Sequence, residues 1–215
     1  MTSASPHTSS LARRERQKAE TRQAILNAAR ELFVADGIEA TTMRAIAVKI
    51  GYTPTAIYHH FRDKQALIEE LCAEDFGALG QAMYRIGRIE NPVERLRRLG
   101  LAYADFALDN PSQYHFMFMT EYRHGHPDGA GHGKPDKDAY EFLLATVTEA
   151  IDSGALRPEL SDPHEVAQMM WSGVHGIVSL YFTHCGDPHI QWRAPRETVR
   201  TMTDVLIRGS VRQTT

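Results

Sequence analysis

The chain has 215 residues, 42% hydrophobic and 24% charged, which is the composition of a globular protein with a sizeable core. No apolar run approaches the roughly 20 residues that cross a bilayer, and the polar first ten residues do not form a secretory signal. Two cysteines, Cys72 and Cys185, are too few for a disulfide framework. We therefore expect a reduced, cytoplasmic protein without a membrane span.

The net charge of −3 is unevenly distributed along the chain. Residues 1–64 contain ten Lys and Arg against six Asp and Glu, so this segment carries +4 and the remainder carries −7. A basic segment ahead of an acidic one indicates that only the first meets a polyanion such as DNA. A chance fluctuation of composition is the alternative explanation.

Helical periodicity begins at about residue 14, after a tail over residues 1–12 that we expect to be disordered. The first predicted helix, over 14–35, carries apolar residues at the i, i+3, i+4 spacing of one buried face. Gly37 ends this helix.

Two short helices are predicted next. Thr41 or Thr42 can cap the first of them, and Gly51 ends it. Thr53 caps the second, a helix of about seven residues, with Pro54 at its first position, where the missing N–H costs nothing.

The rest of the chain shows the same helical periodicity. Asp63 caps a fourth helix, expected over 64–86. Further helices are expected over 91–109, 111–119, 137–153, 162–184 and 195–212. Because no stretch alternates with period 2, we predict an all-α fold without a sheet. The Gly-, Pro- and His-rich segment 123–135 is predicted to be a loop.

The segment from Met43 to Arg62 has the spacing of a helix-turn-helix. Two short helices that cross closely need a small residue, which Ala47 supplies. The turn favours a residue that tolerates positive φ, which Gly51 supplies, and Ile57 inserts into the shared core. An ordinary helical hairpin is the alternative.

The outer side of the predicted recognition helix is polar or small. Contacts to base edges and phosphates in a major groove suit its side chains, which are Thr53, Thr55, Ala56, His59 and His60. Tyr58 can offer its hydroxyl to a phosphate, and Lys64 can offer its ammonium. For His59 and His60 a solvated helix end is the alternative.

From Ala19 to Leu71 the sequence resembles the DNA-binding head of the tetracycline-repressor (TetR) family. The resemblance rests on the Ile-x2-Ala-Ala-x2-Leu-Phe run from Ile25, on Gly37, and on the Tyr-x2-Phe-x2-Lys-x2-Leu run from Tyr58. It implies a three-helix head on a C-terminal helical bundle that dimerises and binds a small molecule. The DNA contacts implied by the family pattern, with their neighbours on the recognition helix, are Thr42, Arg44, Thr53, Pro54, Thr55, Ala56, Tyr58, His59, His60 and Lys64.

A weaker resemblance lies in the second half of the chain. Trp171, His175 and Gly176 match the Trp-x3-His-Gly signature of one TetR C-terminal subclass. Trp171 and His175 are four residues apart and share a helix face. We take both as candidate ligand contacts, followed by Phe118 and Tyr140. Ordinary core packing is the alternative for the aromatic residues, and a satisfied core histidine is the alternative for His175.

Together these features predict a tail over 1–12, a helix-turn-helix domain over 13–64 and a ligand-binding and dimerisation domain over 65–215. The expected function is transcriptional repression, with release from double-stranded operator DNA by a small, mostly apolar ligand. A TetR-like activator, or a regulator without an effector, is the alternative. An all-helical enzyme is disfavoured because no phosphate loop, metal-ligand spacing or nucleophile motif is found. We expect no catalytic residue, metal or cofactor.

Three further sets of residues are assigned a role, or denied one, on weaker sequence evidence. The homodimer is expected to use the helices over 162–184 and 195–212, with a candidate face of Val166, Met170, Gly173, Val174, Ile177 and Tyr181. A basic run leads into the first helix and either reaches phosphates or is a solvated tail: Arg13, Arg14, Arg16, Lys18 and Arg22. Three loop histidines lack the thiolates and fixed spacing of a metal site: His124, His126 and His132.

Overall fold

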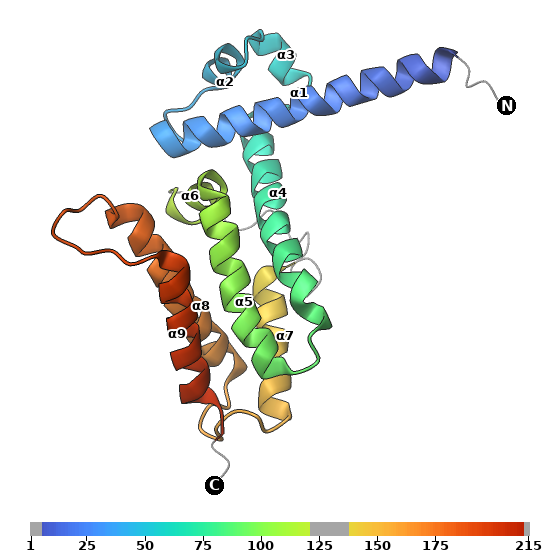
Figure 1. Cartoon of the computed structure of the whole chain (residues 1–215). Coiled ribbons are helices and arrows are strands. Elements are labelled where there is room, and N and C mark those ends of the chain that lie inside the picture. The colour runs from blue at the N-terminus through green and yellow to red at the C-terminus, as the bar shows by residue number, and fades with distance from the viewer. Residues whose placement is uncertain (1–5, 121–137, 213–215) are drawn as a thin grey trace. The chain divides into compact units, whose positions relative to one another are not determined.

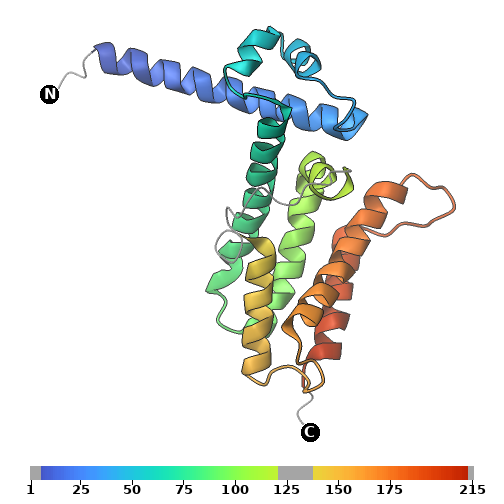
Figure 2. The same cartoon turned by 180° about the vertical axis from the view of Figure 1, so that it is seen from behind.

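The computed structural model describes residues 6–120 and 138–212, which form nine α-helices and one short 3-10 helix (Figures 1 and 2). In chain order they are α1 (Pro6–Asp36), α2 (Met43–Lys49), α3 (Pro54–Tyr58), α4 (Lys64–Tyr84), η1 (Arg85–Arg88), α5 (Pro92–Asp109), α6 (Pro111–Met119), α7 (Ala139–Asp152), α8 (Pro163–His184) and α9 (Pro195–Ser210). Within the described ranges β-type pairing is limited to one isolated bridge, between Leu156 and Val211. The predicted all-α fold is confirmed.

The helix boundaries lie close to those expected, with one correction. From α5 onward every predicted end lies within two residues of the observed one. The exception is the N-terminus, where α1 begins at Pro6, so the prediction of a disordered tail is wrong for residues 6–12. The His-rich segment 123–135 lies outside the described residues.

The chain forms two compact units. The head unit takes in the chain up to Ala73 together with the segment that begins at Ser112. The body unit takes in Glu74–Pro111 and the described chain from residue 138 onward. The boundary falls inside α4, beyond the 64/65 division expected from sequence, so this one helix supplies residues to both units.

The head unit is built around the second half of α1. In Figure 1, α2 and α3 lie together on one side of this helix. Its core consists of side chains that are almost fully buried: Ile25, Ala29, Phe33, Ile46, Ala47, Ile57, Leu67 and Leu71. Phe33 stacks on Phe116 of α6, with ring centroids 5.9 Å apart. The apolar positions read from the helical periodicity therefore do form this core.

In the body unit α5 packs against α7, α8 and α9, and α8 packs against α7 and α9 (Figures 1 and 2). The α8 face suggested above as a dimer interface is largely internal, because Val166, Met170 and Val174 are buried within the single chain. A Cβ on Gly173 would lie 2.9 Å from Leu206 Cδ1 of α9, so this glycine allows α8 and α9 to approach closely. The part of the candidate face formed by Val166, Met170 and Val174 is therefore corrected to core, whereas Gly173, Ile177 and Tyr181 are half-buried.

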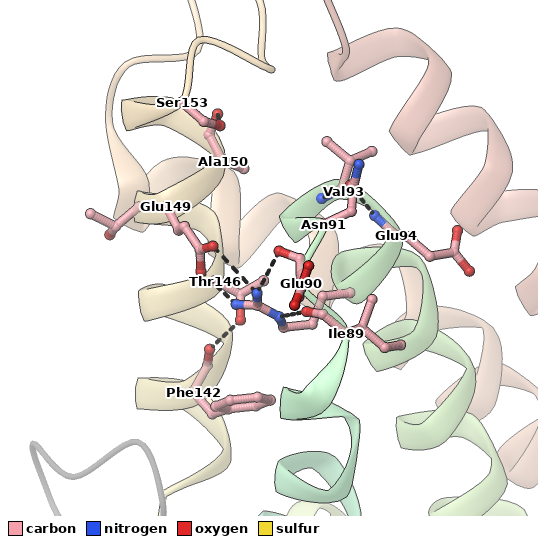
Figure 3. A network of polar contacts seen from close by, with 12 residues as sticks. Ile89, Glu90, Asn91, Val93, Glu94, Phe142, Thr146, Glu149, Ala150 and Ser153 are labelled. Carbon is pink, nitrogen blue, oxygen red and sulfur yellow. Dashed lines mark hydrogen bonds and ion pairs between the residues drawn. The ribbon is translucent and has the colours of Figure 1, made fainter.

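Polar contacts join α7 to the start of α5 (Figure 3). Arg95 donates to both carboxylate oxygens of Glu149, at 2.5 and 3.3 Å, and to the backbone oxygens of Ile89 and Glu90, at 2.8 and 3.0 Å. Asn91 caps α5 by accepting two backbone N–H groups at 3.0 Å. The half-buried guanidinium of Arg95 thereby satisfies the carbonyls of the η1–α5 connection and joins this connection to α7.

Candidate nucleic-acid interface and ligand pocket

The segment α2–turn–α3 has helix-turn-helix geometry. Residues 50–53 connect the two helices, and Gly51 has φ +72°. The Tyr52 N–H donates to Ala47 O at 2.9 Å and the Gly51 N–H donates to Val48 O at 3.1 Å, the pair of bonds that closes a helix through a left-handed residue. Ala47 and Ile57 are fully buried in the shared core. All three sequence requirements of the motif are met.

Threonines begin both helices of the motif. Thr42 Oγ1 accepts the Ala45 N–H at 3.1 Å, and Thr53 Oγ1 accepts the Ala56 N–H at 3.3 Å. In this arrangement each hydroxyl uses a lone pair for the cap and keeps its own proton available. Each can therefore donate to a phosphate oxygen while it caps its helix.

Most of the predicted DNA contacts are on the surface. The exposed members of the set are Thr42, Arg44, Thr53, Pro54, Thr55, Tyr58 and His59. Ala56, His60 and Lys64 are half-buried. Together these ten residues form a polar, largely exposed surface on α3, at the start of α2 and at the start of α4. We call this surface the reading face.

His60 faces partly inward. Its backbone oxygen accepts from Arg22 at 2.6 Å, and its Nδ1 is buried without a hydrogen-bond partner. Burial first, and then the charges of Arg22, Lys18 and His59, lower the pKa of His60. A neutral, half-buried imidazole fits helix packing better than base reading, so within the reading face His59 is the better placed of the two histidines.

Lys64 has a structural role that the sequence did not reveal. Its Nζ donates to the backbone oxygens of Ile38 at 2.9 Å and Thr41 at 3.2 Å. These contacts fix the loop that leads into α2. One of the three ammonium donors is left for the phosphate contact predicted for this residue.

Arg22 does not extend the basic run toward DNA. Its guanidinium forms a two-pronged ion pair with Glu70 of α4, with Nε 2.5 Å from Oε1, and lies 4.2 Å from the centroid of the Phe61 ring. Arg22 is therefore ion-paired within the head unit, with its side chain 37% exposed, and is not part of a free solvated tail. This side chain instead holds α1 against the α3–α4 connection.

The rest of the basic run is exposed on α1. In both views the N-terminal part of this helix projects beyond α2 and α3 (Figures 1 and 2). Its exposed cationic residues are Arg13, Arg14, Arg16 and Lys18. They form a charged helical extension of the head unit.

The body unit contains an apolar pocket of about 30 Å³. Helices α4, α5, α7, α8 and α9 all contribute to its lining, which consists of Met83, Leu96, Leu99, Gly100, Tyr103, Leu143, Met170, Trp171, Val174, Thr203 and Leu206. Trp171 is the one predicted ligand contact among them. The volume is about that of one or two water molecules, so a larger ligand requires its side chains to move.

Three of the four predicted ligand contacts are neighbours in the body unit. The ring centroids of Tyr140 and Trp171 are 6.2 Å apart, and those of Trp171 and His175 are 5.8 Å apart. His175 Nδ1 is 2.7 Å from the hydroxyl of Tyr103, and burial lowers the pKa of His175. Phe118 belongs to the head unit and packs on Tyr114. The structure therefore groups Tyr140, Trp171 and His175 beside the pocket and leaves Phe118 out.

Sequence reasoning missed most of the pocket lining. Two signals were available. Gly100 lies inside α5, where glycine is a poor helix former, and Thr203 interrupts the apolar spacing of Val199 and Ile207 on α9. Each residue breaks a helical pattern, Thr203 at a buried position and Gly100 at a half-buried one.

Two classes of site are not found among the described residues. No group of three or more His, Cys, Asp or Glu side chains in the described ranges could hold a metal ion. The three loop histidines lie outside those ranges. None of the described helices is long and apolar enough to cross a membrane.

The head unit defines a helix-turn-helix protein. Residues 25–71 match the family model described as bacterial regulatory proteins of the tetR family, and residues 96–206 match that of the tetracyclin repressor-like C-terminal domain. The chain belongs to the TetR family of bacterial transcriptional regulators. This membership confirms the predicted family and the expectation of a regulator rather than an enzyme.

Relatives agree with this membership. The chain is 32% identical over 90 residues to the HTH-type transcriptional regulator UidR of Escherichia coli K12, a match that covers 42% of this chain and only 40% of UidR. It is 26% identical over 148 residues to the transcriptional repressor KstR2 of Mycolicibacterium smegmatis, covering 67% and 71% of the two chains. A Rhodococcus protein structure of unknown function aligns with a TM-score of 0.70 and 25% identity, covering 89% and 95%.

Proposed function

We propose that the chain represses transcription by placing the reading face of the head unit in the major groove of an operator. The observation that carries this is the exposed set of Thr, Tyr and His side chains on and beside α3, presented by a motif whose core is formed by the buried Met43, Ile46, Ala47 and Ile57. The exposed cations of α1 would add phosphate contacts. Repression, rather than activation, is supported by the likeness to KstR2, which is named a repressor. Such a protein would work in the cytoplasm.

The proposed repressor acts as a homodimer through α8 and α9. A single short recognition helix makes few contacts, whereas a two-fold pair reads two half-sites about 34–36 Å apart. Large apolar side chains are exposed on these helices, with Leu180 53% and Val205 61% exposed, and a Cβ on Gly176 would meet open space. A second copy would cover these residues. Light scattering should give the mass of a dimer at micromolar concentration, and a monomer there would contradict the proposal.

The proposed effector is a small, mostly apolar molecule that binds the pocket of the body unit. Met83 lines the pocket and lies on α4, whose first turn carries Lys64 of the head unit. A ligand that displaces Met83 can therefore bias the position of α4, but only by its differential affinity for the two arrangements. The expected coupling is about 1–3 kcal/mol, a 5- to 150-fold loss of operator affinity.

The first experiment is a gel shift on the DNA that adjoins the gene. Wild type should retard this fragment, and Tyr58→Ala and His59→Ala should weaken binding by about 1–3 kcal/mol with an unchanged circular dichroism spectrum. Lys64→Ala should weaken binding to all sequences alike. Arg157→Ala, which removes an exposed cation of the body unit, is the matched control. Wild-type affinity in all three variants would show that the reading face is misassigned.

A further inference from the structure

The side-chain hydroxyl of Thr203 is buried and has no hydrogen-bond partner among the residues that the structure describes. The residue lies on α9 and is 4% exposed. Val199 and Ile207, one turn before and after it, are both buried and apolar. A hydroxyl in such a stripe lowers stability unless something bonds to it, so an aliphatic residue would serve packing better.

The space beside this hydroxyl is kept open by Gly100 of α5. A Cβ at this position would lie 2.9 Å from Thr203 Oγ1 and 3.3 Å from Val174 Cγ2. Glycine is unfavourable in a helix interior, and here any side chain would crowd the hydroxyl. Thr203 and Gly100 both line the apolar pocket, so an unpaired polar atom and the room next to it occur in one place.

A buried water does not account for this arrangement. An internal water usually makes about three hydrogen bonds to polar groups. The other hydroxyl of the lining, that of Tyr103, is 2.7 Å from His175 Nδ1, and the rest of the lining includes the aliphatic side chains of Leu206 and Val174. One hydroxyl in an apolar wall suits a single oxygen on an otherwise apolar molecule.

We propose that the effector is an apolar molecule with one hydroxyl or carbonyl oxygen, which bonds to Thr203 Oγ1 in the space beside Gly100. This inference rests on the effector function proposed above and specifies its ligand class. Because the pocket measures about 30 Å³, a ring can enter only if side chains move. The unbranched side chains of Met83 and Met170 in the lining can rearrange at low cost.

Phenol and benzene form a matched pair of probes that differ by one hydroxyl. Their dissociation constants, measured by ligand-observed NMR on the full chain, should show that wild type prefers phenol by about 3- to 10-fold. Thr203→Val keeps the shape of the side chain and removes its hydroxyl, so it should abolish the preference by weakening phenol alone. Thr203→Ser should keep the preference. Gly100→Ala should weaken both probes.

The unliganded protein gives an independent readout. Because Thr203→Val removes an unpaired hydroxyl without leaving a cavity, it should raise Tm by about 2–4 °C. A lower Tm would mean that the hydroxyl already has a structural partner and would overturn the proposal. Equal binding of the two probes, a phenol preference that survives Thr203→Val, or no binding of either probe would overturn it as well.

The effector function itself is tested separately, by operator affinity. A phenol preference that depends on Thr203, with no change in operator affinity at saturating phenol, would support this binding site. The same result would contradict an effector role for phenol-like molecules.

Discussion

The head unit and the body unit are both built from helices, but their candidate sites are made in different ways: one is exposed on a short motif and the other is enclosed by several helices. In the head unit, Thr42 and Thr53 serve the backbone and still face outward, and Arg22 closes the fold with Glu70. In the body unit, the half-buried Arg95 pairs with Glu149 and the exposed Arg196 pairs with Asp105, whereas Thr203 is left unpaired inside. The comparison teaches that a candidate DNA-binding surface can be predicted from one short segment of sequence. A pocket is harder to predict, because its lining comes from helices that are distant in sequence.

The head unit should be the more sensitive to a single core deletion, because its core is small. Ile57→Ala removes a fully buried side chain of the helix-turn-helix and should lower the free energy of unfolding by about 2–5 kcal/mol, with loss of DNA binding. Urea unfolding measures this change. Val48→Ala on the neighbouring helix, where Val48 is 70% exposed, should cost less than about 0.5 kcal/mol. Equal stability of the two variants would refute the assigned core.

In the body unit the largest polar effect should come from Arg95. Its side chain is 11% exposed, and Arg95→Ala leaves Glu149 and the backbone oxygens of Ile89 and Glu90 without their donor (Figure 3). The free energy of unfolding should fall by about 1.5–3 kcal/mol. Chemical denaturation should show this loss at both low and high salt. A loss that disappears at high salt would mean that the pair behaves as a surface ion pair.

Mild acid should destabilise both units, in each case mainly because burial disfavours the charged form of a histidine. The folded-state pKa of His175 lies below the ordinary 6.5 because of burial, as does that of His60 because of burial and then nearby positive charges. The unfolded chain therefore takes up protons first. The stability that the two neutral imidazoles contribute is fully present above pH 6.5, and it is lost as the pH falls through the folded-state pKa of each histidine.

Ionic strength should distinguish the contributions that the two histidines make to the acid sensitivity of unfolding. His175→Gln should reduce the acid sensitivity of unfolding equally at low and high salt. His60→Gln should reduce it more at low salt, because salt screens the charges of Arg22, Lys18 and His59. Thermal unfolding as a function of pH measures both. If neither variant changes the slope of stability against pH, these imidazoles do not carry the effect.

The smallest effect should come from Arg196, which links α9 to Asp105 and Asp109 of α5 at 2.7 and 2.5 Å. These hydrogen bonds raise the pKa of Arg196, but the side chain is 49% exposed. Arg196→Ala should therefore cost less than about 1 kcal/mol, and less still at high salt. If Arg196→Ala lowered the free energy of unfolding as much as Arg95→Ala does, exposure of the arginine would not decide how much its ion pair contributes to stability.

Sequence alone predicted the helix-turn-helix of the head unit, with its turn, its caps and its core residues. Ala47, Gly51 and Ile57 act at short range, and the caps at Thr42 and Thr53 lie within three residues of the groups that they bond. Periodicity and turn chemistry report such local relations directly. The role of Lys64 was missed because its carbonyl partners, Ile38 and Thr41, depend on how the loop before α2 folds.

The body unit was predicted as helices but not as a site. Trp171 and His175 were proposed as ligand contacts from a local signature in which they lie one turn apart, whereas the contact between His175 and Tyr103 joins α8 to α5. Gly173 was assigned to a dimer face although it packs against α9 of the same chain. A helical pattern identifies a buried face but does not say which helix covers it.

The central claim is that the reading face recognises one DNA sequence. Fluorescence anisotropy with the fragment that adjoins the gene, and with a scrambled fragment of equal length, tests it most directly. Wild type should bind the first fragment on the order of 10³-fold or more tightly than the second, and the double variant Tyr58→Ala, His59→Ala should lose most of this ratio. Equal affinity of wild type for the two fragments would contradict the account.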